Sequence, residues 1–234
     1  MTSAPQLAAV GDELLDHPDA DPAVVRESLR HIARSNRWFG GWWAVRRGLG
    51  RVLGTAPRTK PLTLLDVGTG LGDLPCAAVR WAGRRGITLR PIGLERHRTA
   101  AALANQQGVA TLLGCAGALP VGAKSVDVVI ASQLVHHLAP DAIVAFCREA
   151  DRIARVGVVI ADLRRSRWAL AGFWIGSRLL GFDRATRQDG LTSVRRGFTE
   201  AELVVLLGRA GIAARIERTP GFRLVVTWKQ GAGA

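Results

Sequence analysis

The chain has 234 residues, a formal net charge of +13 and three cysteines. This length suffices for one α/β domain with additional helical elements, so no second domain is required. The cysteines are odd in number and lack metal-ligand spacing, which excludes a disulfide framework, predicts no metal site and indicates small core residues in a reducing cytoplasm. No uninterrupted apolar run approaches the roughly 20 residues that span a bilayer.

The excess positive charge is concentrated in two segments. Residues 25–60 hold nine basic residues against one glutamate, and residues 164–196 hold eight arginines against two aspartates. Such a balance raises nucleic acid as a partner. Tyrosine is absent, no RNA-binding module is recognisable, and the tryptophans cluster with aliphatic residues, which together argue against a base-stacking surface. We expect a small apolar or anionic substrate instead, or an acidic carrier protein that delivers one.

The N-terminal segment is predicted to form a helical cap over residues 1–60. Its first residues, Met1 to Asp21, lack an apolar h-region, so no signal peptide is expected. Residues 22–37 place apolar side chains on one face at helical spacing and arginines on the other, and residues 42–53 continue as a second helix.

Seven strand candidates follow, with helices in most of the intervals between them. They cover residues 62–66, 88–94, 110–113, 126–131, 156–161, 213–218 and 223–229. The first five alternate with helices as a parallel sheet requires, and the last two form a hairpin around Thr219-Pro220-Gly221. The prediction is an α/β, Rossmann-like fold over residues 61–234. Its seven-stranded sheet is mostly parallel, with an antiparallel last strand.

The first strand runs into a glycine-rich turn, Leu64-Leu65-Asp66-Val67-Gly68-Thr69-Gly70-Leu71-Gly72-Asp73. Glycines at alternate positions let the backbone turn tightly and approach a ligand, while the following helix presents its N-terminus. Glu95 ends the second strand, twenty-three residues after Gly72, where such folds place a carboxylate for ribose hydroxyls. A dinucleotide-binding dehydrogenase would have its third glycine at the position that Asp73 occupies, which argues against that class.

The segments LLDVGTGLGDLP, IGLERH and ALPVGAKSVDVVIASQLVHHL resemble class I S-adenosylmethionine-dependent methyltransferases, and the match extends over Leu62 to Lys229. The resemblance implies S-adenosyl-L-methionine as cofactor and S-adenosyl-L-homocysteine as product. One departure is Cys115, where the family often has an aspartate that accepts from adenine; a thiol is a poor acceptor, so the backbone is expected to read the base. The implied cofactor residues are Asp66, Gly68, Thr69, Gly70, Gly72, Asp73, Glu95, Arg96, Cys115, Ala116 and Ser132.

The reaction chemistry is expected where the fourth and fifth strands end, because open α/β sheets bind ligands at the carboxyl ends of their strands. His136 and His137 follow the fourth strand, and Asp162 follows the fifth. These residues resemble those of small-molecule O-methyltransferases of secondary metabolism, with a histidine as general base and the carboxylate orienting it. His137 is favoured over His136. Two alternatives stay open: carbon methylation of a quinone-like substrate, and a methyltransferase-like protein that binds cofactor or partner without turnover.

The insertion after strand five, at about residues 164–196, lies where this family places a substrate lid. Residues 168–182 carry one charge in fifteen and are flanked by arginines. They are expected to close an apolar pocket; the alternative is contact with a membrane surface. The expected substrate contacts from both cap segments are Trp38, Phe39, Trp168, Phe173 and Arg195.

Overall fold

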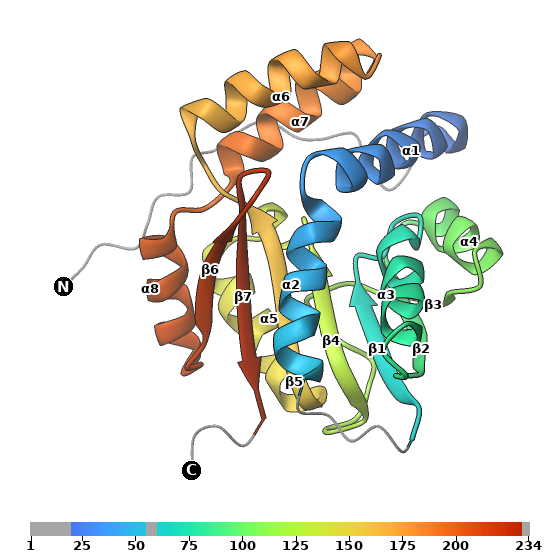
Figure 1. Ribbon diagram of the computed structural model, residues 1–234, viewed down its shortest axis with the longest axis vertical. Helices are drawn as coiled ribbons and strands as arrows, with labels where there is room; N and C mark the ends of the chain where they lie inside the picture. The colour runs from blue at the N-terminus through green and yellow to red at the C-terminus, as the bar shows by residue number, and fades with distance from the viewer. Residues whose placement is uncertain (1–19, 55–59, 231–234) are drawn as a thin grey trace.

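A seven-stranded sheet organises the computed structural model, which describes residues 20–54 and 60–230 (Figure 1). The strand order is β3-β2-β1-β4-β5-β7-β6, and β7 is antiparallel to both of its neighbours. The predicted Rossmann-like fold is therefore confirmed, and the structure adds that β7 inserts between β5 and β6. The strands are β1 (Leu62–Val67), β2 (Leu89–Glu95), β3 (Ala110–Leu113), β4 (Val126–Ser132), β5 (Ala154–Leu163), β6 (Arg215–Thr219) and β7 (Arg223–Lys229).

Helices cover both faces of the sheet because the central strands are apolar on both sides. In β1, Leu64 packs with α2 (Gly41–Leu53) and α3 (Asp73–Gly83), whereas Leu65 packs with α5 (Pro140–Ile153) and α8 (Glu200–Ala210). This continuous burial is typical of a parallel sheet between two helical layers. The helix α4 (Arg98–Gln106) contacts β2 and β3.

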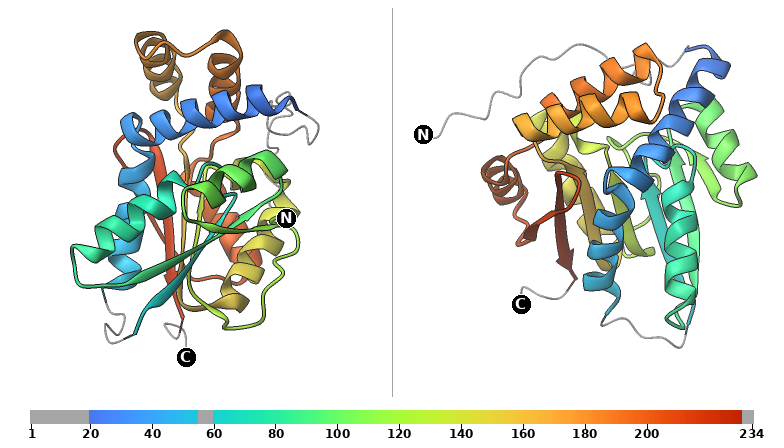
Figure 2. Two further views of the ribbon diagram at one scale, coloured as in Figure 1. Left: turned by 90° about the vertical axis from the view of Figure 1, so that its right-hand side faces the viewer. Right: turned by 45° about the horizontal axis from the view of Figure 1, so that its top comes forward.

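Three further helices lie across the carboxyl ends of the parallel strands (Figures 1 and 2). They are α1 (Pro22–Trp38), α6 (Arg167–Leu179) and α7 (Arg184–Arg196), and a short 3-10 turn, η2 (Val135–His137), follows β4 beneath them. The predicted cap segment 1–60 is thus divided: α1 lies over the strand ends, whereas α2 buries its apolar face on the sheet. Residues 1–19 and 55–59 of that segment lie outside the described residues.

Local sequence signals set the helix boundaries that matter for the cap. Asp21 caps α1 through Ala23 N and precedes a proline at the first helical position, and Asp183 caps α7 through Thr186 N. Within the described parts of the chain, no helix is long and apolar enough to cross a membrane.

The contact between α2 and β5 gives a stability prediction. A Cβ atom added at Gly48 would overlap Val159 Cγ1, so Gly48→Ala should lower the free energy of unfolding by about 1–3 kcal/mol through overpacking. The matched control is Gly50→Ala on the exposed side of the same helix, where the nearest atom would lie 3.9 Å away. That change should raise the free energy of unfolding by up to about 1 kcal/mol through helix propensity. Denaturant titrations measure both, and equal effects would contradict the packing argument.

Candidate functional site

The glycine-rich turn after β1 adopts a backbone that side chains disfavour. Gly68, Gly70 and Gly72 have φ values of +74°, +54° and +76°, in the left-handed region where residues with a Cβ are strained. Gly72 is also the N-cap of α3, so the turn leads directly into a helix N-terminus. The backbone here can approach a ligand closely.

Glu95 connects this turn to the end of β2 through hydrogen bonds. Its Oε2 accepts a hydrogen bond from Gly70 N at 2.9 Å, and its Oε1 accepts from Arg96 N at 2.8 Å and His97 N at 3.0 Å. The side chain faces the cavity described below. Glu95 therefore positions the loop and offers a carboxylate edge to a ligand.

Asp66 is fully buried beneath the turn and does not line the cavity. Its Oδ2 accepts from Thr69 Oγ1 at 3.0 Å. Burial raises the pKa of Asp66 to about 8; the Thr69 hydrogen bond opposes this shift, and the neighbouring Asp73 and Glu95 carboxylates add to it. The expected cofactor residue thus acts from behind the loop.

A buried carboxylate and imidazole form a pair where β4 and β5 end. His136 Nδ1 lies 2.6 Å from Asp162 Oδ1, and both side chains are almost completely buried. Asp162 also accepts from the backbone N–H groups of Leu163 at 2.7 Å, Val135 at 3.0 Å and His136 at 3.3 Å. Burial alone would raise the pKa of Asp162, but the His136 charge and hydrogen bond outweigh it, so the pKa lies below its usual range.

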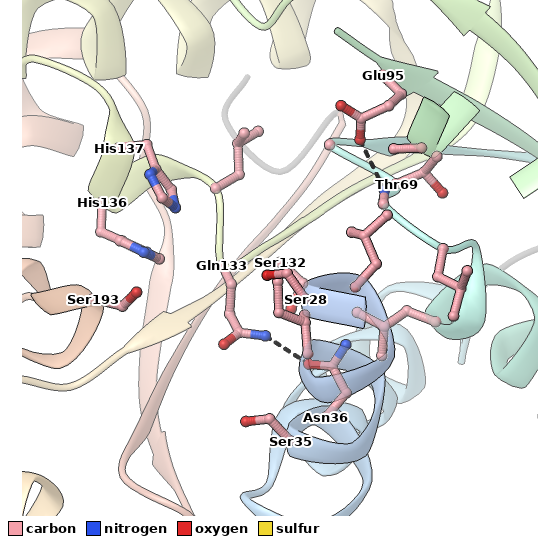
Figure 3. Close-up of a pocket in the computed structure, with 18 of the residues that line it drawn as sticks. Ser28, Ser35, Asn36, Thr69, Glu95, Ser132, Gln133, His136, His137 and Ser193 are labelled. Atoms are coloured by element: carbon pink, nitrogen blue, oxygen red, sulfur yellow. Dashed lines mark hydrogen bonds between the residues drawn. The ribbon is translucent and has the colours of Figure 1, made fainter. Parts of the chain in front are cut away.

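His137 lies beside this pair in a different environment. Its ring centroid is 4.2 Å from that of His136, and its Nδ1 is 3.4 Å from Arg196 Nη1. Figure 3 shows both imidazoles on the same side of the pocket, opposite Glu95 and Thr69. Asp162 therefore orients His136 and not His137, the histidine that the sequence pattern favours.

One cavity of about 420 Å³ joins these groups. The predicted site residues that line it are Gly68, Thr69, Gly70, Asp73, Glu95, Arg96, Cys115, Ala116, Ser132, His136, His137 and Phe173. Asp66, Gly72 and Asp162 support the walls from behind. The structure thus brings the glycine turn, Glu95 and the histidines together in one space.

Four of the expected substrate contacts do not line this cavity. Trp38 is 63% exposed and Trp168 is 73% exposed, Arg195 is exposed, and Phe39 packs against Phe173 with centroids 5.5 Å apart. The expected contacts assume that tryptophans face inward, but the helical phase of α6 turns Trp168 outward and Phe173 inward. Next to Arg195, Arg196 is the arginine that reaches a site residue, His137.

Helix α1 supplies a wall of the cavity that the sequence motifs do not reveal. Asn36 Nδ2 donates to Asp73 Oδ2 at 3.1 Å, and its Oδ1 accepts from Gln133 Nε2 at 2.6 Å (Figure 3). Farther along, buried His31 lies 3.0 Å from Thr186 Oγ1 of α7. In the sequence, the only signal for this wall is that α1 contains uncharged polar residues and a histidine in addition to its arginines. Other lining residues outside the predicted set include Ser28, Leu29, Ser35, His97, Phe182, Asp189, Ser193 and Arg223.

Comparison with known proteins agrees with this arrangement. A family model described as a methyltransferase domain matches residues 65–161. No curated protein matches the chain significantly. The structure of the plantazolicin methyltransferase in complex with S-adenosylhomocysteine is 15% identical, with a TM-score of 0.66 over 92% of this chain and 93% of that chain. A SAM-dependent methyltransferase from Aquifex aeolicus is 16% identical, with a TM-score of 0.61 over 89% and 98%.

A third structure, magnesium protoporphyrin IX methyltransferase from Synechocystis with bound S-adenosylmethionine, is 13% identical. Its TM-score is 0.60, over 96% of this chain and all of that chain. At these identities the likeness establishes the fold. The chain has the class I methyltransferase fold. Within that fold, residues 65–161 are similar to the methyltransferase-domain family model.

The raised pKa of Asp66 predicts a pH dependence of stability. The folded protein keeps the Asp66 proton up to about pH 8, whereas an aspartate in the unfolded chain, with a pKa of 3.8, loses its proton at much lower pH. Because the unfolded state binds fewer protons in this window, the contribution of Asp66 to the free energy of unfolding falls as pH rises through it. Asp66→Asn cannot ionise, so its stability relative to the parent should increase between pH 3.8 and about 8. Denaturant titrations across this range test this, with the exposed Asp141→Asn as control; a constant difference would contradict it.

Proposed function

We propose that the protein transfers a methyl group from S-adenosyl-L-methionine to a hydroxyl of an apolar, aromatic or polyketide-like small molecule, with a histidine as general base. The observation that carries the proposal is the Asp162–His136 pair, because His136 lines the same cavity as the glycine turn and Glu95 while Asp162 holds it from behind. The end of the cavity beside the glycine turn suits a nucleoside cofactor, and the other end contains a group that can accept or donate a proton.

The cofactor half fits S-adenosylmethionine. The left-handed glycines leave open backbone, the Glu95 carboxylate suits ribose hydroxyls, and the buried Ser132 Oγ has no hydrogen-bond partner among the described residues. Cys115 and Ala116 line the cavity where the adenine is expected. When bound, the cofactor supplies an electrophilic methyl group on a sulfonium.

His136 is the better base on geometric grounds. A carboxylate with a lowered pKa only accepts hydrogen bonds, so the proton between Asp162 and His136 lies on Nδ1. When the imidazole is neutral, the other ring nitrogen, Nε2, carries the lone pair. It is buried at the cavity and has no partner within the described residues. This arrangement lets Nε2 take the proton of an acceptor hydroxyl while Asp162 stabilises the resulting imidazolium.

Aromatic and aliphatic side chains line part of the acceptor half, which favours an aromatic or polyketide-like acceptor. Phe173 and Phe182 line it from α6 and the turn that follows, and Leu163 lines it from β5. Apolar side chains in these walls exclude water from the Asp162–His136 pair. Carbon methylation of a quinone-like acceptor would use the same cavity, and the oriented base is what favours a hydroxyl. The free thiols Cys76, Cys115 and Cys147 support placing the enzyme in a reducing cytoplasm.

For the cofactor, Glu95→Gln is expected to weaken S-adenosylhomocysteine binding about tenfold or more, because charged hydrogen bonds of roughly 1.5–3 kcal/mol are lost. Calorimetry measures the affinity. Glu149→Gln, a change of the same kind at a half-buried glutamate paired with Arg152, should leave the affinity unchanged. A folded Glu95→Gln protein with parental affinity would place the cofactor elsewhere.

For the base, His136→Ala should lower methyl transfer to the best acceptor of a phenol panel by about 10² to 10⁴, the range for a positioned general base, while cofactor affinity is kept. Asp162→Asn should lose less. His137→Ala is the matched control from the neighbouring position and should retain most activity. An acidic limb in the pH–rate profile that persists in His136→Ala would assign the base to another group. Cofactor binding without methylation of any phenol would favour carbon methylation or a non-catalytic role.

A further inference from the structure

Arg223 is a buried cation on the acceptor side of the cavity. It begins β7, pairs in register with Leu163 at the end of β5, and is 2% exposed. The residue lines the same cavity as His136. A guanidinium this deeply buried is unusual unless it is paired.

The hydrogen bonds of Arg223 leave part of its guanidinium unused. Its Nε donates to the Phe39 carbonyl oxygen at 3.2 Å, whereas Nη1 is buried and has no partner among the described residues. The Asp162 carboxylate interacts with the Arg223 guanidinium by charge attraction alone. Both oxygens of that carboxylate already accept hydrogen bonds, from four N–H donors in total. Burial lowers the pKa of Arg223 to about 10, so the group still carries its charge at neutral pH.

The position of Arg223 in the sheet separates it from the cofactor half. Glu95 ends β2, and the strand order places β1, β4 and β5 between β2 and β7. At about 4.8 Å per strand, these four steps amount to roughly 19 Å. His136, by contrast, is paired with Asp162 at the end of β5, the strand next to Arg223.

We propose that Arg223 binds a carboxylate of the methyl acceptor, so that the acceptor is a hydroxyarene acid whose hydroxyl faces His136 Nε2. The inference rests on the proposed function and deepens it by naming the acceptor class. The unpartnered Nη1 group carries N–H donors that suit a carboxylate oxygen, and a guanidinium forms charge-assisted hydrogen bonds with such an oxygen. The apolar walls from Phe173 and Phe182 suit the arene and strengthen the charge interaction by excluding water.

The test compares the three hydroxybenzoate isomers with the corresponding neutral hydroxybenzamides. Affinities are measured by calorimetry and ligand-observed NMR on the protein saturated with S-adenosylhomocysteine. At least one hydroxybenzoate should bind the parent about tenfold to a hundredfold more tightly than its amide, the effect of one charged hydrogen bond. Arg223→Gln should abolish this preference, and Arg223→Lys should keep part of it. Arg215→Gln, at an exposed arginine of β6, should leave it unchanged.

The following binding results would overturn the inference. Equal affinity for acid and amide, or no binding of any hydroxybenzoate at millimolar concentration, would show that Arg223 does not select a carboxylate. Loss of S-adenosylhomocysteine affinity in Arg223→Gln with the acid preference intact would assign the arginine to the cofactor. If Arg223→Gln does not fold, the parent and Arg223→Lys still decide. Failure of the parent to bind S-adenosylhomocysteine would instead contradict the proposed function. In that case, comparing the acid with the amide on the protein without S-adenosylhomocysteine still tests Arg223.

Discussion

The site depends on one buried carboxylate. Asp162 ends β5 and satisfies donors from three places: the backbone of η2, its own strand end and the His136 ring. A buried charge of this kind is tolerated only when its oxygens are fully hydrogen-bonded. That requirement sets the conformation of the turn after β4, the ring orientation of His136 and the electrostatic surroundings of Arg223 together. The geometry of the proposed base and the local fold therefore have the same cause.

The cap over the strand ends is built from two segments that are far apart in the sequence. Helix α1 precedes the sheet, whereas α6 and α7 follow β5, and all three lie over the strand ends (Figure 2). Residues of all three helices line the cavity. Glycines make the close approach possible, since a Cβ at Gly176 would overlap the Phe39 ring and one at Gly190 would overlap Phe173. Aromatic rings therefore fill the space between the helices. The result is a cavity whose roof combines aromatic rings such as Phe173 with polar side chains such as Asn36 and Asp189.

The sheet and the cofactor motifs were predictable because they follow local rules. The apolar runs predicted all seven strands, and the glycine turn and Glu95 were recognisable by their spacing. The residues of the cap that face the cavity were not predictable, because hydrophobicity alone does not tell which side of α6 faces the site. Trp168 is exposed, whereas Phe173 lines the cavity. Which of His136 and His137 is oriented by a carboxylate could not be predicted from the sequence either. It depends on a contact to Asp162 across two strands, which no local pattern encodes.

Helix α1 touches both halves of the cavity. Asn36 bonds Asp73 beside the glycine turn, and His31 bonds Thr186 in the lid. A ligand that orders this helix from either side reduces the conformational entropy that the second ligand must remove. The affinities for cofactor and acceptor are therefore expected to be coupled, and linkage makes that coupling reciprocal. Because α1 lines both halves of the cavity, binding of the two proposed ligands is expected to be thermodynamically cooperative even though their subsites lie several strands apart.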